Sequence, residues 1–193
     1  METSLIYTCN IGGDLALLPR LHTFIREARQ SAILIDLGNA CSPQVWHCEA
    51  TQGRSTLMVL DAMGYDVAYA ALPAESRAKL HDHIMMSLVD EAHAITYKDI
   101  LFTTESRHDG FEIIMIPGEQ TYLQEESLYL QELQAGEVGF VSIKDGEVTQ
   151  SIRKIPPRTA PDPSISGTVE FVLSEARYFQ RKNHHQRHQN GKS

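Results

Sequence analysis

Polar and sulfur-containing side chains follow two short apolar segments near the start of the chain. Ser4–Thr8 is followed by Cys9 and Asn10, and Ala32–Leu37 is followed, after one glycine, by Asn39. Both apolar segments have the length and β-branched content of buried strands. The carboxyl ends of neighbouring parallel strands meet at one edge of a sheet, where ligands bind. We therefore expect a candidate ligand-binding site at this edge.

The loop after the second segment adds two cysteines and a histidine. Cys41, His47 and Cys48, together with Cys9 in the neighbouring loop, are the residue types that bind zinc in a tetrahedral site. Their spacing matches no zinc motif, and cysteines are commonly small buried groups, which is the favoured interpretation. The side chains that could bind a ligand at this edge are Cys9, Asn10, Asn39, Cys41 and His47.

Helical periodicity alternates with strand-like segments through the first half of the chain. Asp14 is predicted to cap a helix that extends to about Arg29, and further helices are predicted over Thr51–Met63 and Ser76–Ala94. Tyr65–Ala71 is the third predicted strand. This alternation of strands and helices implies right-handed crossovers and a largely parallel sheet.

The second half is predicted to be rich in β-structure. Lys144–Glu147 is typical of a hairpin turn between two strands. The prolines of Pro156–Pro163 indicate an extended connector before a final helix over Ser166–Phe179. The predicted strands of this half are Asp99–Thr104, Phe111–Ile116, Ser127–Leu133, Glu137–Ile143 and Val148–Ile155.

Length and charge limit the remaining possibilities. The chain has 193 residues, 42% of them hydrophobic, and we predict one α/β domain over residues 1–180. Residues 181–193 are basic, rich in histidine and without an apolar side chain, so we expect a disordered tail. The net charge of −8 argues against binding to nucleic acid or to an anionic membrane. Three cysteines without framework spacing indicate free thiols, and no signal peptide or membrane span is predicted, so we expect a cytoplasmic location.

Three stretches of the sequence are similar to calcineurin-like metallophosphoesterases of the 5′-nucleotidase type. The segment LIYTCNIGGD resembles the family's first strand, which ends in a D-x-H-G motif. In the segment AILIDLGNACSPQVWHCEATQGRSTLMVLDAMGYD, Gly38, Gly53 and Met63–Asp66 match the next strand and helix, and the closing segment AGEVGF to LSEAR is also similar. The resemblance covers about Ser4–Asp66 and Ala135–Arg177. It implies an αββα sandwich of two mixed sheets, shortened here and forming a single domain.

The resemblance implies a site for two divalent metal ions, but the metal-binding residue types are missing at the matching positions. The family's first aspartate falls on Asn10 and its histidine on Gly12, while the bridging aspartate of a G-D motif falls on Asn39. A later G-N-H-E motif falls near Leu72 and Pro73. Neutral amides bridge two dications poorly, and glycine, leucine and proline offer no side-chain ligand. The degenerate motif positions are Asn10, Gly12, Gly38, Asn39, Leu72 and Pro73.

We therefore predict a metallophosphoesterase-fold protein that has lost catalysis, needs no metal or other cofactor, and acts in binding or interaction. Its partner would be a protein or a small phosphorylated ligand, and a shortened domain with an uncovered sheet would favour a homo-oligomer. Two alternatives stay open. A rebuilt hydrolase site could hold one metal ion through Asn10, Asn39, His47 or a cysteine. A phosphate could instead bind the backbone N–H groups of the turn Asn10–Gly13.

Overall fold

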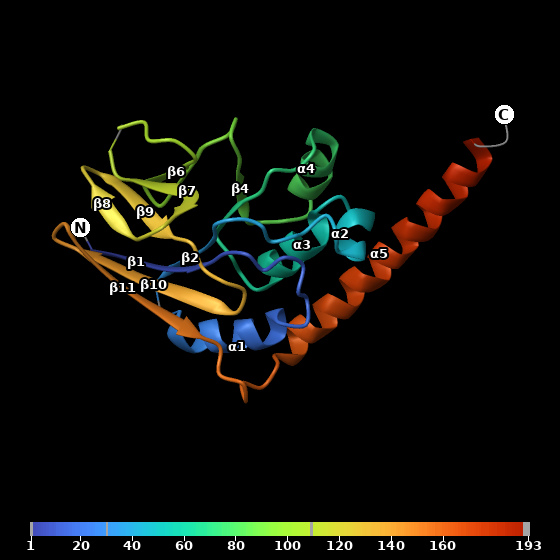
Figure 1. Ribbon diagram of the computed structural model, residues 1–193, viewed down its shortest axis with the longest axis horizontal. Helices are drawn as coiled ribbons and strands as arrows, with labels where there is room; N and C mark the ends of the chain where they lie inside the picture. The colour runs from blue at the N-terminus through green and yellow to red at the C-terminus, as the bar shows by residue number, and fades with distance from the viewer. Residues whose placement is uncertain (1, 30, 109, 191–193) are drawn as a thin grey trace.

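The computed structural model describes residues 2–29, 31–108 and 110–190, and the side chains as far as residue 182. Two mixed β-sheets pack face to face, and the described helices lie beside the first sheet (Figure 1). The helices are α1 (Leu18–Ala28), α2 (Trp46–Ala50), α3 (Arg54–Ala62), α4 (Ala74–His81) and α5 (Pro163–Asn190).

The first sheet has the strand order β11-β10-β1-β2-β3-β4. Strands β1 to β4 are parallel to one another, and β10 pairs antiparallel with β1. The parallel part confirms the crossovers predicted for the first half of the chain. The strands of this sheet are β1 (Glu2–Thr8), β2 (Ile33–Asp36), β3 (Val67–Tyr69), β4 (Ser87–Val89), β10 (Glu137–Lys144) and β11 (Glu147–Lys154).

The second sheet is built from the middle of the chain. Its strand order is β5-β6-β7-β9-β8, with β6, β7 and β9 parallel and the two edge strands antiparallel to their neighbours. The strands are β5 (Ile95–Tyr97), β6 (Ile100–Thr103), β7 (Glu112–Gly118), β8 (Tyr122–Gln124) and β9 (Ser127–Gln131).

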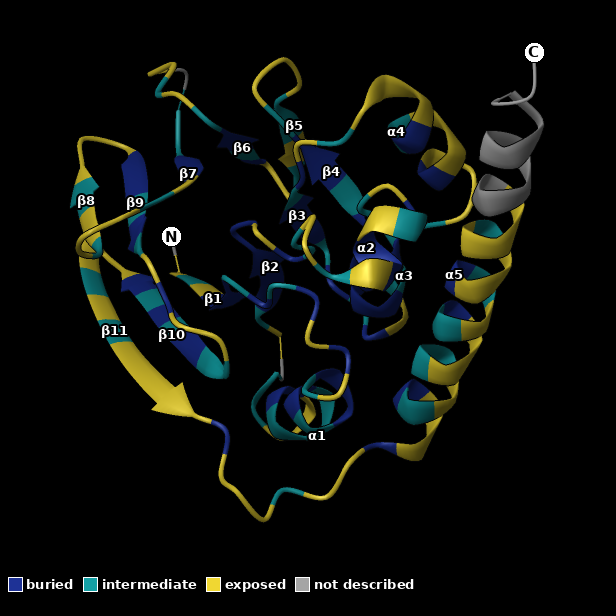
Figure 2. Cartoon of the chain, turned by 45° about the vertical axis from the view of Figure 1, so that its right-hand side comes forward, coloured by how far each residue is buried: buried dark blue, intermediate teal, exposed yellow. Residues whose placement is uncertain are grey.

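Strands β1 and β2 are buried on both faces. Ile6 and Leu34 belong to the core cluster shared with the helices, whereas Leu5, Tyr7 and Ile35 belong to the cluster between the two sheets. Side chains of a strand alternate between its faces, so both faces must be apolar when both are covered. This double burial explains the uninterrupted apolar segments from which these strands were predicted, and Figure 2 shows β2 as buried.

The helices cover one side of the sandwich only. Helix α5 packs against α1, α2 and α3 along the first sheet, as Figures 1 and 2 show. In the described ranges, no helix lies on the outer face of the second sheet, where the αββα arrangement has its other helical layer. Ile116 and Tyr122 of that sheet are exposed. The expected shortening is therefore a loss of this outer layer, and the described sandwich has three layers.

Two predicted helices differ from the observed ones. Helix α1 begins at Leu18 rather than at Asp14, because residues 14–17 form a turn in which Asp14 Oδ1 accepts a hydrogen bond from the Leu17 N–H at 3.2 Å. The helix predicted over Ser76–Ala94 is wrong beyond His81. The chain turns there and adds β4, whose three residues are too few to show an alternating pattern.

Helix α5 is longer than predicted. It extends to Asn190, where we expected a disordered tail from residue 181, and residues 191–193 lie outside the described part of the chain. Lysine, arginine and glutamine are good helix formers, and neither glycine nor proline interrupts the segment from 181 to 190. No described helix has both the length and the apolar character that crossing a membrane requires.

Asp36 is fully buried at the end of β2. Its carboxyl oxygens accept hydrogen bonds from Thr8 Oγ1 at 2.7 Å and from the Gly38 N–H at 3.0 Å. The Thr8 hydroxyl lies 3.0 Å from the Tyr65 hydroxyl, so a polar cluster fills this part of the core. Burial raises the pKa of Asp36 to about 7, because the charged form is poorly solvated and the two hydrogen bonds offset this only in part.

We predict that stability falls as the pH rises from about 4 to about 7. Asp36 ionises near pH 3.8 in the unfolded chain but holds its proton to about pH 7 in the fold. The folded state therefore binds more protons in this window, and raising the pH favours unfolding, by up to about 1.4 kcal/mol per pH unit. Urea denaturation at several pH values measures this slope. Asp36→Asn does not titrate and should flatten it; an unchanged slope would contradict the assignment.

Candidate functional site

The loops after β1 and β2 meet at the carboxyl edge of the first sheet, as the sequence predicts. Asn39 Nδ2 donates a hydrogen bond to Asn10 Oδ1 at 2.9 Å. Asn10 Nδ2 donates in turn to Glu132 Oε1 at 2.8 Å and to the carbonyl oxygen of Leu133 at 2.9 Å. Glu132 and Leu133 follow β9, so this chain of hydrogen bonds joins the edge of the first sheet to the second sheet.

The backbone of the two loops is also joined. Asn10 and Asn39 have positive φ angles of 58° and 53°, a conformation that asparagine adopts more readily than most residues. The N–H groups of Asn10, Gly12 and Gly13 donate to the carbonyl oxygens of residues 38–40 at 3.1, 2.8 and 2.9 Å. These donors are therefore not free to bind an anion. The phosphate-binding alternative loses the N–H groups on which it depended.

The groups at this edge do not fit two divalent metal ions. Asn10 and Asn39 are neutral and already hydrogen-bonded to each other, and Gly12 has no side chain. Glu132 contributes a single carboxylate, which accepts from Asn10. A pair of dications needs several anionic or imidazole ligands at once. The donor atoms at this edge therefore do not suit a pair of divalent ions.

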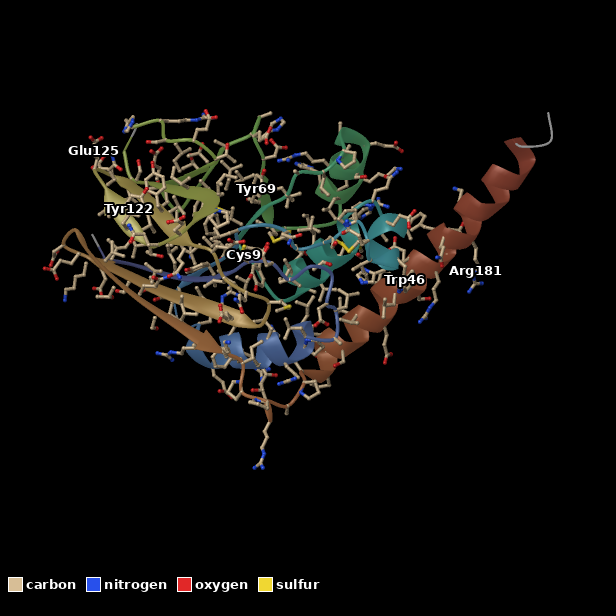
Figure 3. All side chains as sticks on the ribbon, viewed as in Figure 1. Cys9, Trp46, Tyr69, Tyr122, Glu125 and Arg181 are labelled. Carbon is tan, nitrogen blue, oxygen red and sulfur yellow. A yellow bond between two sulfur atoms is a disulfide. The ribbon has the colours of Figure 1, made fainter. Side chains whose placement is uncertain are left out.

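A pocket of about 390 Å³ opens beside these loops, at the carboxyl ends of β2 and β3. Leu72 and Pro73, near which the resemblance places the family's G-N-H-E motif, are in its wall together with Asn39. Most of the lining is apolar, and Glu49 is its one charged side chain. Tyr69, labelled in Figure 3, comes from β3 on the side toward the second sheet. The pocket is therefore a mostly apolar surface beside the asparagine pair.

Cys41 and Cys48 form a disulfide bond, with their Cα atoms 5.6 Å apart. The free thiols predicted from the sequence are therefore wrong for these two residues, and Cys9 is the free cysteine. An odd number of cysteines gives no sign of this pair in the sequence. The two sulfur atoms meet because the loop after β2 folds back at the start of α2. Both cysteines line the pocket.

His47 lies against this disulfide. Its Nδ1 atom is 3.7 Å from Cys48 Sγ and 2.8 Å from Ser55 Oγ, and its Nε2 atom is 3.0 Å from the carbonyl oxygen of Gly13. Burial lowers the pKa of His47, which favours the neutral ring. Trp46, the first residue of α2, contacts the His47 ring edge to face at a centroid distance of 5.6 Å and is 37% exposed.

Cys9 is separate from this group. It is buried in the cluster between the two sheets, and Figure 3 shows it apart from the yellow disulfide bond near Trp46. Burial raises the pKa of the Cys9 thiol to about 12, so it stays protonated and unreactive. The predicted candidates thus divide into an asparagine pair, a group of Cys41, His47 and Cys48, and a buried Cys9.

Glu132 and Ser55 were missed by the sequence analysis. Glu132 lies in the stretch between residues 72 and 134, which resembles no family motif closely enough to align, so no signal pointed to it. Ser55 lies in the first turn of α3, and its contact with His47 depends on how α2 and α3 pack. Contacts of this kind become visible only in the folded chain.

The architecture of the two sheets and the helical layer is that of a shortened metallophosphoesterase-like fold. The chain is similar to the calcineurin-like phosphoesterase YfkN from Bacillus subtilis, with a TM-score of 0.61 and 8% sequence identity over 93% of this chain and 99% of that one. It is also similar to the NAD nucleotidase NadN from Haemophilus influenzae, with a TM-score of 0.57 and 8% identity over 92% of this chain and 60% of that one. No family model and no curated protein matches the sequence. Identities this low establish the fold, as the resemblance implied, and the activity depends on this chain's own residues.

Gly38 provides a test of how tightly the pocket wall is packed. Its φ is +110°, and a Cβ atom at this position would lie 2.6 Å from Tyr69 Cδ1. We predict that Gly38→Ala lowers the free energy of unfolding by about 3 kcal/mol, through backbone strain and a forced shift of the Tyr69 ring. Gly146→Ala is the matched control, because its φ of +83° is also positive but nothing lies within 4 Å. If urea denaturation shows the same loss of unfolding free energy in Gly38→Ala and Gly146→Ala, the contact with Tyr69 is unimportant.

Proposed function

We propose that this chain is a non-catalytic metallophosphoesterase-fold protein that acts as a binding or interaction module. The observation that carries the proposal is the hydrogen bond from Asn39 to Asn10. These residues occupy the positions at which the resembling enzymes hold their metal ions with aspartates. Here the side chains are satisfied by each other and by the chain that follows β9.

Each amide has a role that an aspartate would not fill. Asn39 donates a hydrogen bond to Asn10, and Asn10 donates to Glu132 and to the carbonyl oxygen of Leu133. A carboxylate has no proton to give to these acceptors, and it would place a second negative charge beside Glu132. The edge is therefore built around neutral amides, which supports a structural role in place of metal binding.

The apolar pocket is the proposed ligand site. Its volume of about 390 Å³ lies within the range of small-molecule sites. The lining includes Glu49 but neither lysine nor arginine, and the nearby N–H groups of Asn10, Gly12 and Gly13 are already engaged. Both observations disfavour a phosphorylated ligand. An apolar small molecule or an apolar side chain of a protein partner suits this lining better.

The proposal includes the cytoplasmic location and the homo-oligomer expected from the sequence. The exposed Ile116 and Tyr122 lie on the sheet that lacks a helical layer and would suit contact with another chain. In a reducing compartment, a solvent-accessible disulfide such as Cys41–Cys48 would be kept reduced, as two thiols. Size-exclusion chromatography with light scattering measures the oligomeric state directly.

Phosphoesterase turnover decides between this proposal and a rebuilt hydrolase. We predict that the purified protein, incubated with manganese or zinc, does not hydrolyse bis-p-nitrophenyl phosphate above the rate of the free metal. Elemental analysis of the same samples should show no pair of metal ions per chain. Turnover that Asn39→Ala abolishes would overturn the proposal, because Asn39 would then hold a catalytic metal. Glu49→Gln serves as the control for Asn39→Ala, because it changes the pocket wall and leaves the asparagine pair intact.

Restoring the family's aspartate should destabilise the fold. We predict that Asn10→Asp lowers the free energy of unfolding at pH 7 by about 1 kcal/mol, because the Leu133 carbonyl oxygen and the exposed Glu132 carboxylate lose their donor and two carboxylates come into contact. Adding Glu132→Gln should recover part of this loss, since its side-chain amide could donate a hydrogen bond to the new carboxylate. A urea-denaturation double-mutant cycle measures the coupling. A stable Asn10→Asp variant would mean that the asparagine is not required by the fold.

A further inference from the structure

Cys41, His47 and Cys48 are held as a compact group with the donor types that zinc prefers. Within the described ranges they are the one set of three histidine, cysteine or acidic side chains whose ligand atoms all lie within 4.8 Å of one another. Thiolate and neutral imidazole are the usual zinc ligands in proteins. The group lies outside the asparagine pair and does not depend on the proposed function.

We propose that the reduced chain binds one zinc ion through Cys41, His47 and Cys48, and that formation of the Cys41–Cys48 disulfide releases this ion. The two states exclude each other, because both cysteine sulfurs are needed either for the metal or for the S–S bond. The structure holds the disulfide state. Three observations of this state indicate that the same side chains suit a metal ion.

The first observation is the orientation of the histidine. His47 Nε2 lies 3.0 Å from the carbonyl oxygen of Gly13, which can only accept a hydrogen bond, so Nε2 carries the ring proton. The lone pair of the neutral ring is then on Nδ1, the atom that faces Cys48 Sγ. Metal-binding histidines are commonly fixed in this way by a carbonyl group on their other nitrogen. His47 is therefore already in the tautomer that a metal requires.

The second observation is the distance between the donor atoms. Cys48 Sγ lies 3.7 Å from His47 Nδ1. Zinc bonds of about 2.3 Å to sulfur and 2.0 Å to nitrogen at a tetrahedral angle place those atoms about 3.5 Å apart. Reduction of the disulfide lets the second sulfur, of Cys41, separate to the position of a third ligand. The fixed pair therefore already has the spacing of two zinc ligands.

The third observation is the polar surroundings of the sulfur atoms. Ser55 Oγ and Thr56 Oγ1 each lie 3.3 Å from Cys41 Sγ, and Ser55 Oγ is also 3.8 Å from Cys48 Sγ. Both hydroxyls come from the first turn of α3. Hydroxyl donors and the positive end of a helix stabilise thiolates. When Nδ1 binds a metal, the Ser55 hydroxyl can turn from the histidine to a thiolate.

The fourth ligand position would face the pocket. Cys41 and Cys48 both line it, so an ion held between them would be reachable from that side. Sites with three protein ligands and an open position can bind water or an added ligand. Zinc in this group would therefore place a charged ion with an open ligand position at one end of an otherwise apolar pocket.

The conversion between the two states is a thiol–disulfide exchange with a small-molecule disulfide as the oxidant. One cysteine thiolate attacks a sulfur of the oxidant, forms a mixed disulfide and expels one thiolate. The other cysteine then attacks the protein sulfur of the mixed disulfide, forms the Cys41–Cys48 bond and expels the second thiolate. Two electrons pass from the protein to the oxidant, and the zinc ion leaves with its charge unchanged.

The test compares zinc binding by the full chain in its two redox states. The background variant carries His184→Gln, His185→Gln and His188→Gln, so that histidines near the C-terminus do not bind the metal. Competition with a chromogenic chelator measures the affinity, after reduction with a phosphine or oxidation with glutathione disulfide. We expect one zinc ion per reduced chain and at least 100-fold weaker binding by the disulfide form.

Single substitutions identify the ligands. Cys41→Ser and Cys48→Ser should each weaken zinc binding at least 100-fold and, at saturating cobalt, reduce the thiolate-to-metal charge-transfer absorption by about half, because one thiolate remains. His47→Gln should weaken binding at least 10-fold but keep that absorption. Cys9→Ser is the matched control, because Cys9 is buried between the sheets. The zinc affinity of this variant should not change. Thermal melts of each variant show whether it is folded.

Two outcomes would overturn the proposal. A folded, reduced chain that binds no zinc would make Cys41–Cys48 a structural disulfide. The ion would lie at other residues if the reduced and oxidised forms bound zinc with equal affinity. The same would follow if Cys41→Ser bound zinc as tightly as the reduced chain with Cys41 intact. Neither outcome bears on phosphoesterase turnover, so the result is separate from the test of the proposed function.

Discussion

The burial of β1 and β2 on both faces is the constraint on which the rest of the molecule depends. Helices pack on one face and the second sheet packs on the other, so neither strand can move without disturbing two core clusters. Their carboxyl ends are fixed as a result, and the loops that leave them are held at one edge of the sandwich. Every candidate site described above, from the asparagine pair to the disulfide, lies on or beside those loops.

At that edge internal hydrogen bonds join the loops. The asparagine pair and the backbone bonds from residues 10–13 to residues 38–40 join the two loops without a metal ion. Metal ions often hold such loops together in proteins that bind them. Here the two loops are joined by amide and backbone hydrogen bonds, with the Glu132 carboxylate as a further acceptor, and an apolar pocket lies beside them.

The sequence predicted the parts of the structure that depend on local pattern. The doubly buried strands, the crossovers and the meeting of Asn10 with Asn39 follow from apolar segments and from the geometry of parallel sheets. The sequence predicts helix where the short strand β4 lies, because three residues show no period. The disulfide, Glu132 and the Ser55 contact depend on how distant segments pack, and one sequence gives no measure of that.

The disulfide closes a small ring of chain that contains the start of α2 and the protein's one tryptophan. The indole of Trp46 rests edge-on against the imidazole of His47 and is partly open to solvent. An S–S bond quenches the emission of a neighbouring indole. The fluorescence of the unlabelled protein therefore comes from a point beside the sulfur pair, and the molecule carries a built-in optical probe of its own oxidation state.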